Sequence, residues 1–445
     1  MRVPIKISLM VMLVFLPFCL FGAGRVLTLE SYLAGIKKND PRFSEILLEK
    51  TRIGFQKGLF LEHDRLSVAV EGERGFIVGN EESFSSKKLQ VTKEWRQTGT
   101  RLELGFDADD SMGIKTETRR ARLSQSLTKN AFGSVARLKE KVALLNEKII
   151  LAEALLAYED YLMERIVFYL DWVLVDFQLK AARKALDDAA KMTAYVERRL
   201  GKQIAVEADF LSAKLEEMEK KEEYLRLEGK RAAFLIDLHQ YKEWGKVTRP
   251  SLRVPFADLG KIKAKEPRRL MALYRHKKEL AQINLMISKE ALSSDLLASL
   301  SFRHLKAARF TEPNRKDIVF GLSWQIPVMQ RSEEARVAQS SYALKKAEKS
   351  SQVALTRAKK GYLELLEEIK SHQTLVGLAH QRLKHARKLF TAQKERYQKG
   401  LLDFTLLAAS KNRLERAITW QMTLKVELAK KNVRMLNHTN SLLEF

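Results

Sequence analysis

Two very long stretches without helix breakers restrict what this chain can fold into. Residues 134–200 contain neither glycine nor proline, and residues 328–397 contain no proline and only Gly361 and Gly377. At about 1.5 Å per residue, each stretch predicts a helix of roughly 100 Å. Helices of this length do not fit inside an ordinary compact domain, so we expect a mostly α-helical, extended architecture.

Each long stretch is followed by a glycine and a second helical pattern. Gly201 ends the first stretch and Gly400 the second, and helical patterns resume from about Val206 and Phe404. A glycine between two helical patterns is typical of a helix C-terminus followed by a reversal. The sequence therefore predicts two long antiparallel helical hairpins, with tips near residues 201 and 400.

Segments with a period of two precede both long helices and predict β-strands. The clearest lies at 318–326, and weaker ones lie at 65–71, 89–95, 101–106, 120–127 and 296–302. Four to six strands are too few for one chain to close a water-filled barrel, because an eight-stranded barrel is already filled by side chains. If the apolar face meets lipid, several chains must pool their strands. A soluble sandwich would show similar alternation.

The order of elements recurs along the chain. Asn39-Asp40-Pro41-Arg42 is echoed by Lys265-Glu266-Pro267-Arg268, and Leu123-Ser124 and Gly201 are echoed at one constant offset by Leu322-Ser323 and Gly400. A constant offset across strand and helix end indicates an internal duplication. We expect repeat 1 at 25–249 and repeat 2 at 250–445, with extra strand residues in repeat 1, mostly the 89–106 hairpin. The alternative is two independent domains.

The second long helix carries a seam of mostly small residues spaced four and three apart, which is typical of coiled-coil packing. Its members are Ala347, Ser351, Ala354, Ala358, Gly361 and Leu365. A second apolar stripe runs about 100° away on the same helix. Two seams favour packing neighbours on both sides, as in a wall of helices, over one broad stripe in an ordinary bundle.

The N-terminus predicts export. Arg2 and Lys6 precede an apolar run at 7–21 and then Gly22-Ala23-Gly24, which is typical of a secretory signal peptide at 1–24. The alternative is a membrane anchor, but the run is shorter than the ~20 residues that a spanning helix needs. The only cysteine is Cys19, and bulky Phe18 before it disfavours a lipid anchor. We expect a mature chain without a thiol.

The charge pattern and the absence of catalytic, metal-binding and phosphate-binding motifs argue against most other functional classes of protein. The formal net charge of +25 comes from Lys and Arg interleaved with Glu, which favours solvated helix faces or contact with anionic lipid. A nucleic-acid binder would require the export signal to be misread. The 8 histidines show no metal-ligand spacing, and no phosphate loop is present. We therefore expect a protein that is not an enzyme, with no catalytic residue, metal or cofactor.

Two motifs resemble the TolC family of outer-membrane channel proteins, and the resemblance covers essentially the whole mature chain. They are the strand Val319 to Pro327 leading to Arg336-Val337-Ala338-Gln339, and the turn Arg396-Tyr397-Gln398-Lys399-Gly400-Leu401. The resemblance implies a homotrimer with a twelve-stranded β-barrel in outer-membrane lipid above a periplasmic helical tunnel. It also implies docking to a periplasmic adaptor (membrane fusion protein) and an inner-membrane pump or secretion ATPase.

The same resemblance places a periplasmic gate at the hairpin tips, closed by polar and charged contacts. By position, the implied gate residues are Arg199, Gly201, Glu207 and Asp209 at the first tip, and Arg396, Tyr397, Gly400, Asp403 and Thr405 at the second. Leu406 and Ala409 stand where the family often has aspartates. Each candidate has the alternative role of capping a helix or carrying solvated charge.

These observations lead to two functional hypotheses. The first is an outer-membrane exit duct of a tripartite efflux or type I secretion system, in which substrate moves passively through a trimeric channel. The second is a periplasmic coiled-coil adaptor or scaffold without a pore, which would have one hairpin where this chain has two. The basic tips predict a cationic or weakly selective aperture, and their charges include Arg198, Lys202, Lys394 and Lys399.

Overall fold

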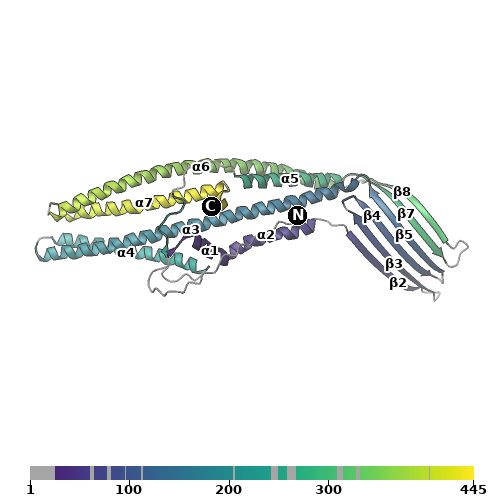
Figure 1. The fold of residues 1–445 in the computed structure, drawn as a ribbon, viewed down its shortest axis with the longest axis horizontal. Helices are drawn as coiled ribbons and strands as arrows, with labels where there is room; N and C mark the ends of the chain where they lie inside the picture. Colours follow the sequence, from purple (N-terminus) through teal and green to yellow (C-terminus); the bar gives the residue numbers. More distant parts are fainter. Residues whose placement is uncertain are drawn as a thin grey trace, which may run out of the picture. The chain divides into compact units, whose positions relative to one another are not determined.

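The computed structural model describes residues 26–60, 65–77, 82–95, 97–111, 114–203, 206–241, 249–257, 267–307, 314–326, 331–399 and 401–444. The expected signal peptide and Gly400 lie outside these ranges. The chain divides into two units. Its helices and strands are labelled in Figure 1. The sheet unit comprises Asp40–Val167, Phe256–Leu375 and Glu427–Phe445, and the tip unit comprises Met1–Asn39, Phe168–Pro255 and Val376–Val426.

The sheet unit contains one antiparallel sheet of six strands, in the order β2-β3-β4-β5-β7-β8. The strands are β2 (Arg65–Ile77), β3 (Glu82–Trp95), β4 (Thr100–Ser111), β5 (Ile114–Ser126), β7 (Asp295–Ala307) and β8 (Asn314–Gln325). The turn between β3 and β4 has Gly99 at φ 70, a conformation that favours glycine. Strands β2 and β8 are the edges, so the sheet of one described chain stays open.

Helices of the sheet unit pack beside one another. Helix α2 (Pro41–Phe60) contacts α3 (Ser134–Gly201) through Phe43, whose ring lies 5.5 Å from that of Tyr158. Helix α5 (Arg268–Ala291) contacts α3 in an apolar cluster in which Val142, Leu145 and Ile283 are buried. Helix α6 (Arg331–Gln398) meets α5 in the Lys278–Glu348 ion pair of 3.1 Å. α3, α5 and α6 are thus joined by packing and charge.

Two buried carboxylates fix helix ends in the sheet unit. Asp40 is 1% exposed, and its oxygens accept hydrogen bonds from the backbone N–H of Arg42, the Tyr161 hydroxyl and the Arg165 guanidinium. Glu159 is fully buried, pairs with Arg269 and accepts from the Asn440 side chain. Asp40 thereby caps the start of α2 onto α3, since buried charges need such partners.

The tip unit is built from the two hairpins. Helix α3 continues into it and is followed by α4 (Glu207–His239), while α6 is followed by α7 (Phe404–His438). Leu383 and Ala386 of α6 pack on Ala417 of α7. α1 (Leu29–Asn39) packs on α3, where the rings of Tyr32 and Tyr169 lie 5.4 Å apart. A short parallel pairing of β1 (Val26–Leu27) with β6 (Arg249–Pro250) completes the unit.

The predicted fold class is confirmed: the chain is mostly helical, with two long hairpins and a β portion that a single chain does not close. The long helices begin and end within a few residues of their expected bounds, and all six expected strands form. The antiparallel sheet has six strands, at the upper end of the expected four to six. The short helices before each strand set begin at Pro41 and Arg268, where the duplicated proline motifs lie.

Candidate functional site

The hairpin ends in the tip unit share one apolar cluster. Val196 of α3, Ala213 of α4, Tyr397 of α6, and Phe404 and Leu407 of α7 are all at most 8% exposed. Each of the four helices contributes at least one residue, because apolar side chains face inward at the last turn before or the first turn after each reversal. The burial of these side chains holds the two tips together.

Arg199 lies against two tyrosine rings at the edge of this cluster. Its guanidinium carbon is 5.9 Å from the ring centre of Tyr195 and 5.6 Å from that of Tyr397. The two rings meet edge to face with centres 6.3 Å apart. Burial raises the pKa of Tyr397 above its ordinary value, and the nearby Arg199 charge opposes the shift. The contact is between a cation and two aromatic rings.

The structure brings together only part of the implied gate set. Arg199 and Tyr397 are in contact, and Asp209 is close enough for its charge to raise the pKa of Tyr397. The remaining described candidates are solvent-exposed, namely Gly201, Glu207, Arg396, Asp403 and Thr405. Gly400 lies outside the described residues. The assignment of all these residues to a gate stays a prediction.

Tyr195 and Phe404 belong to this site and were not among the sequence candidates. Tyr195 precedes Arg199 by four residues, so a helical spacing rule places the two on one face of α3. Phe404 lies 6.5 Å, centre to centre, from Tyr397 across the second tip. The spacing was a usable signal for Tyr195. The position of Phe404 depends on the geometry of the reversal, which the sequence pattern does not specify.

Polar contacts fix the four helices behind the tip. Lys220 of α4 pairs with Glu415 of α7 at 2.8 Å, and Asn412 of α7 donates to Glu216 of α4 at 3.0 Å. The Thr193 hydroxyl of α3 donates to the carbonyl of Ala213 in α4 at 3.2 Å. Side-chain bonds thus cross between the hairpins as well as within the first one. They restrict sliding of one hairpin against the other.

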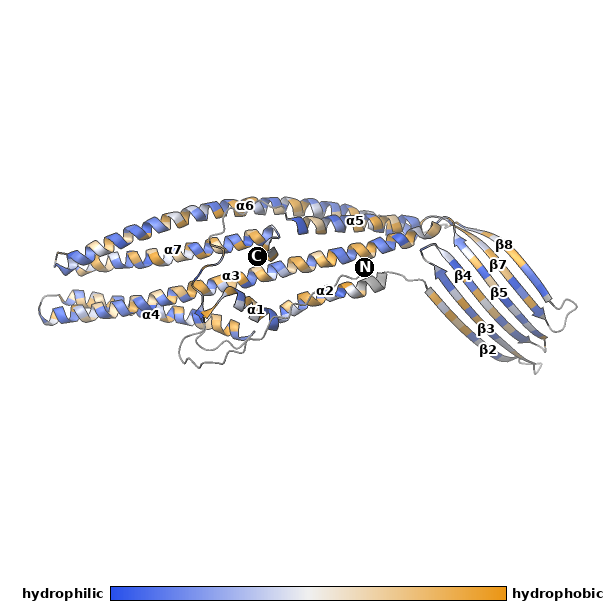
Figure 2. Cartoon of the chain, in the orientation of Figure 1, coloured by the Kyte–Doolittle hydropathy of each residue, from blue (hydrophilic) through white to orange (hydrophobic). Residues whose placement is uncertain are grey.

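The six-stranded sheet has one apolar and one polar face. Figure 2 shows hydrophobic and hydrophilic residues alternating along its strands. On one face of edge strand β8, the exposed apolar side chains are Ile318, Phe320, Leu322 and Trp324, each at least 67% exposed. The opposite face carries ion pairs, including Arg120 with Asp107 and Arg303 with Asp317. An apolar outer face and a charged inner face are what a strand between lipid and water requires.

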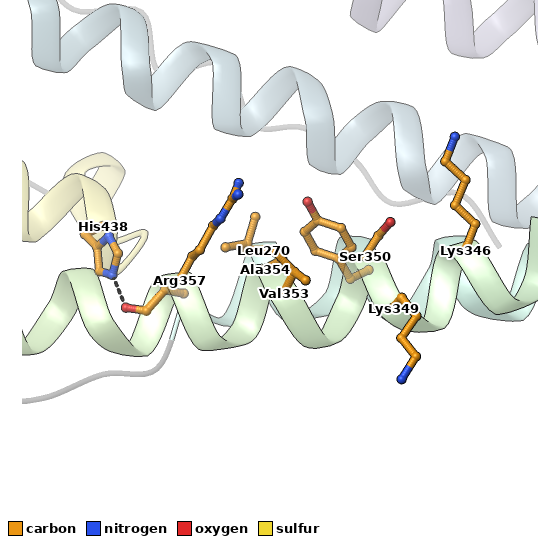
Figure 3. Close-up of a pocket in the computed structure, with 10 residues that line it drawn as sticks. Leu270, Lys346, Lys349, Ser350, Val353, Ala354, Arg357 and His438 are labelled. Carbon is orange, nitrogen blue, oxygen red and sulfur yellow. Dashed lines mark hydrogen bonds between the residues drawn. The ribbon is translucent and has the colours of Figure 1, made fainter.

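A basic groove lies in the sheet unit between α5, α6 and the end of α7. It has a volume of about 630 Å³ and is lined by Leu270, Tyr274, Lys346, Lys349, Ser350, Val353, Ala354, Arg357, Ala358 and His438. Figure 3 shows Lys346, Ser350 and Arg357 on one side of α6, with Lys349 pointing away. The His438 Nε2 atom forms a hydrogen bond of 2.7 Å with the Ala358 carbonyl oxygen. The groove is open and cationic, and its chemistry suits an anionic group.

Two features are absent from the described residues. None of their helices is both long enough and apolar enough to cross a membrane. Nor do they contain a cluster of three or more His, Cys, Asp or Glu side chains that could hold a metal ion.

No protein-family model matches the sequence. No curated protein matches it either. Solved structures, in contrast, match over nearly the whole chain. CusC is similar with a TM-score of 0.70 at 11% identity, over 92% of this chain and 91% of CusC. This chain has the fold of the TolC-like outer-membrane channels.

Two other structures with the TolC-like fold agree. The outer-membrane protein VceC from Vibrio cholerae gives a TM-score of 0.68 at 11% identity, over 92% of this chain and 95% of VceC. The MtrE outer-membrane channel of Neisseria gonorrhoeae, in its open state, gives 0.66 at 12% identity, over 93% and 89%. The expected resemblance is thus confirmed at the level of the fold. Because so few residues are shared, the residues of the tip have to be understood from this chain alone.

Proposed function

We propose that this protein is an outer-membrane exit duct, a passive trimeric channel that serves a tripartite efflux or type I secretion system. The observation that carries the proposal is the open six-stranded sheet with an apolar band on one face, in a chain with two long helical hairpins and the TolC-like fold. An open sheet whose edges and apolar face are exposed needs other copies and lipid to satisfy both. A periplasmic adaptor would have no use for such a face.

The proposal extends to location and partners. The sheet spans the outer membrane, and the helical hairpins extend into the periplasm. There they dock on a periplasmic adaptor and an inner-membrane pump or secretion ATPase. No phosphate-binding loop is present in the sequence, so the energy for export comes from the partner. The two tandem repeats at 25–249 and 250–445 supply one strand set and one hairpin each, and removal of the signal peptide at 1–24 precedes assembly.

We further infer that the contact of Arg199 with Tyr195 and Tyr397 holds the tips closed. The contact joins α3 of the first hairpin to α6 of the second, so separating the tips requires breaking it. Where the family often has aspartates, Leu406 and Ala409 supply no charge. Closure in this chain therefore adds a cation packed on aromatic rings to the apolar cluster of the tips. The basic residues around it make the aperture cationic or weakly selective.

Recording single-channel currents in planar bilayers tests this role of Arg199. Arg199→Ala removes a cation–π contact worth about 0.5–1 kcal/mol per ring at a partly exposed site. We expect the open probability of the channel to rise several-fold. The matched control is Arg198→Ala, since Arg198 is the exposed neighbour and its guanidinium donates to the Ala194 carbonyl within its own helix. An equal rise in both variants, or none with Arg199→Ala, would overturn the assignment.

A further inference from the structure

An apolar band crosses all six strands on one face of the sheet. The ladder registers place one residue of each strand directly opposite the next, and directly opposed residues lie on the same face. One such row consists entirely of apolar residues: Val68, Val91, Leu104, Ala121, Phe302 and Ile318. The neighbouring row on the same face is apolar except for Lys93: Leu66, Lys93, Leu102, Leu123, Leu300 and Phe320.

The rows between these, on the opposite face, are polar through most of the sheet. One of them reads Ser67, Thr92, Glu103, Arg122, Ser301 and Val319 across the six strands. The alternation therefore includes β2 and β3, which lie at the edge of the four strands β2 to β5 of repeat 1, where repeat 2 has only β7 and β8 in this sheet. On β2, Val68 is 60% and Val70 is 76% exposed. The β2–β3 hairpin is therefore suited to lipid on one side and water on the other, like the other four strands.

The lengths and directions of the strands also fit a membrane barrel. Each strand has 12 to 14 residues, which exceeds the ~9–11 residues that a tilted strand needs to cross a bilayer. Every neighbouring pair is antiparallel, and the number of strands is even. The edge strands β2 and β8 consequently run in opposite directions. β8 of one copy can therefore continue the antiparallel ladder into β2 of the next.

Given the proposed trimeric duct, we propose that three copies pool all six strands of each chain into one barrel of eighteen strands, closed by pairing β8 of one copy with β2 of the next. A barrel of twelve would use four strands per chain and leave the apolar face of the β2–β3 hairpin outside the wall. Barrel diameter grows roughly linearly with strand number, and barrels of about 16–18 strands enclose an aqueous channel. The exit is then about half as wide again as one of twelve strands.

Electron cryomicroscopy of the purified full-length channel in lipid nanodiscs counts the strands directly. We expect a three-copy barrel of eighteen strands in which β2 lies beside β8 of the neighbouring copy. A three-copy barrel of twelve strands, with β2 and β3 outside the wall, overturns the inference and leaves the proposed exit duct intact. A particle without any closed barrel overturns the proposed function itself.

Disulfide crosslinking gives a second, independent result. The expected mature chain has no cysteine, so introduced cysteines are the only thiols. We expect Val68→Cys, combined in turn with Ile318→Cys, Phe320→Cys and Leu322→Cys, to give linked dimers and trimers for at least one pair under mild oxidation. Leu104→Cys with the same three partners is the matched control, because β4 would adjoin β8 only in a twelve-stranded barrel. Links from Leu104 and none from Val68 overturn the inference.

Discussion

Asp40 is a single side chain on which the joining of two helices depends. It is buried, and its carboxylate accepts hydrogen bonds from both Tyr161 and Arg165 of α3. Asp40→Ala removes this acceptor from a buried ion pair, and we expect a loss of about 3–5 kcal/mol in the free energy of unfolding. Chemical denaturation measures it. Glu164→Ala, which removes the exposed Arg42–Glu164 pair, should cost only about 0–1 kcal/mol. Equal losses would contradict the account.

Tyr169 makes the stability of the folded protein fall as the pH becomes alkaline. Its hydroxyl donates to the Leu27 carbonyl, and burial raises its pKa from 10.0 to about 12. A raised pKa contributes stability that is present below pH 10 and lost as pH rises through about 12. We expect Tyr169→Phe to lower stability at pH 7 by about 1 kcal/mol through the lost hydrogen bond. Between pH 10 and 12, the stability of this variant should fall less steeply than that of the unmodified protein. An unchanged slope in thermal unfolding across that range would exclude Tyr169 as the cause.

At the scale of elements, neighbouring residues of α7 have different surroundings. Leu407 is 2% exposed in the tip cluster, whereas Leu406 is 55% exposed. Leu407→Ala should destabilise the tip by about 2–5 kcal/mol, because it leaves a cavity where the hairpins meet. Leu406→Ala should change stability by about 0.5 kcal/mol or less. Hydrogen exchange of the amides around residues 196 and 397 reports the difference. Faster exchange in both variants would contradict the packing described.

The elements themselves follow closely from the sequence, and their contacts do not. The helix and strand bounds depend on local signals: missing breakers, alternation at 318–326 and the turn at Gly99. The resemblance identified Arg199 and Tyr397 as candidates, but their contact depends on how α3 packs beside α6, which no local pattern encodes. Glu207 and Thr405 were also candidates, but both are exposed to solvent. The sequence does not distinguish a polar residue near a reversal that contacts a partner from one that faces water.

At the scale of the whole molecule, the distribution of charge and the open sheet are the features that bear on assembly. The Lys and Arg residues behind the net charge of +25 are spread along the helices, and several of them pair with carboxylates in each unit. In the tip unit, for example, Lys220 pairs with Glu415. The open sheet edges and the apolar strand face of a single chain have no partner within the described residues. Several copies in lipid satisfy both requirements at once, which is why oligomerisation is central to the proposed duct.

Native mass spectrometry of the mature protein released from detergent tests this central claim most directly, because it counts the chains in one particle. We expect a single dominant species of three chains that persists on dilution. The three-chain species is expected because the sheet of one chain stays open and its apolar face needs closure into a barrel. A dominant single-chain species under the same conditions would contradict the exit duct.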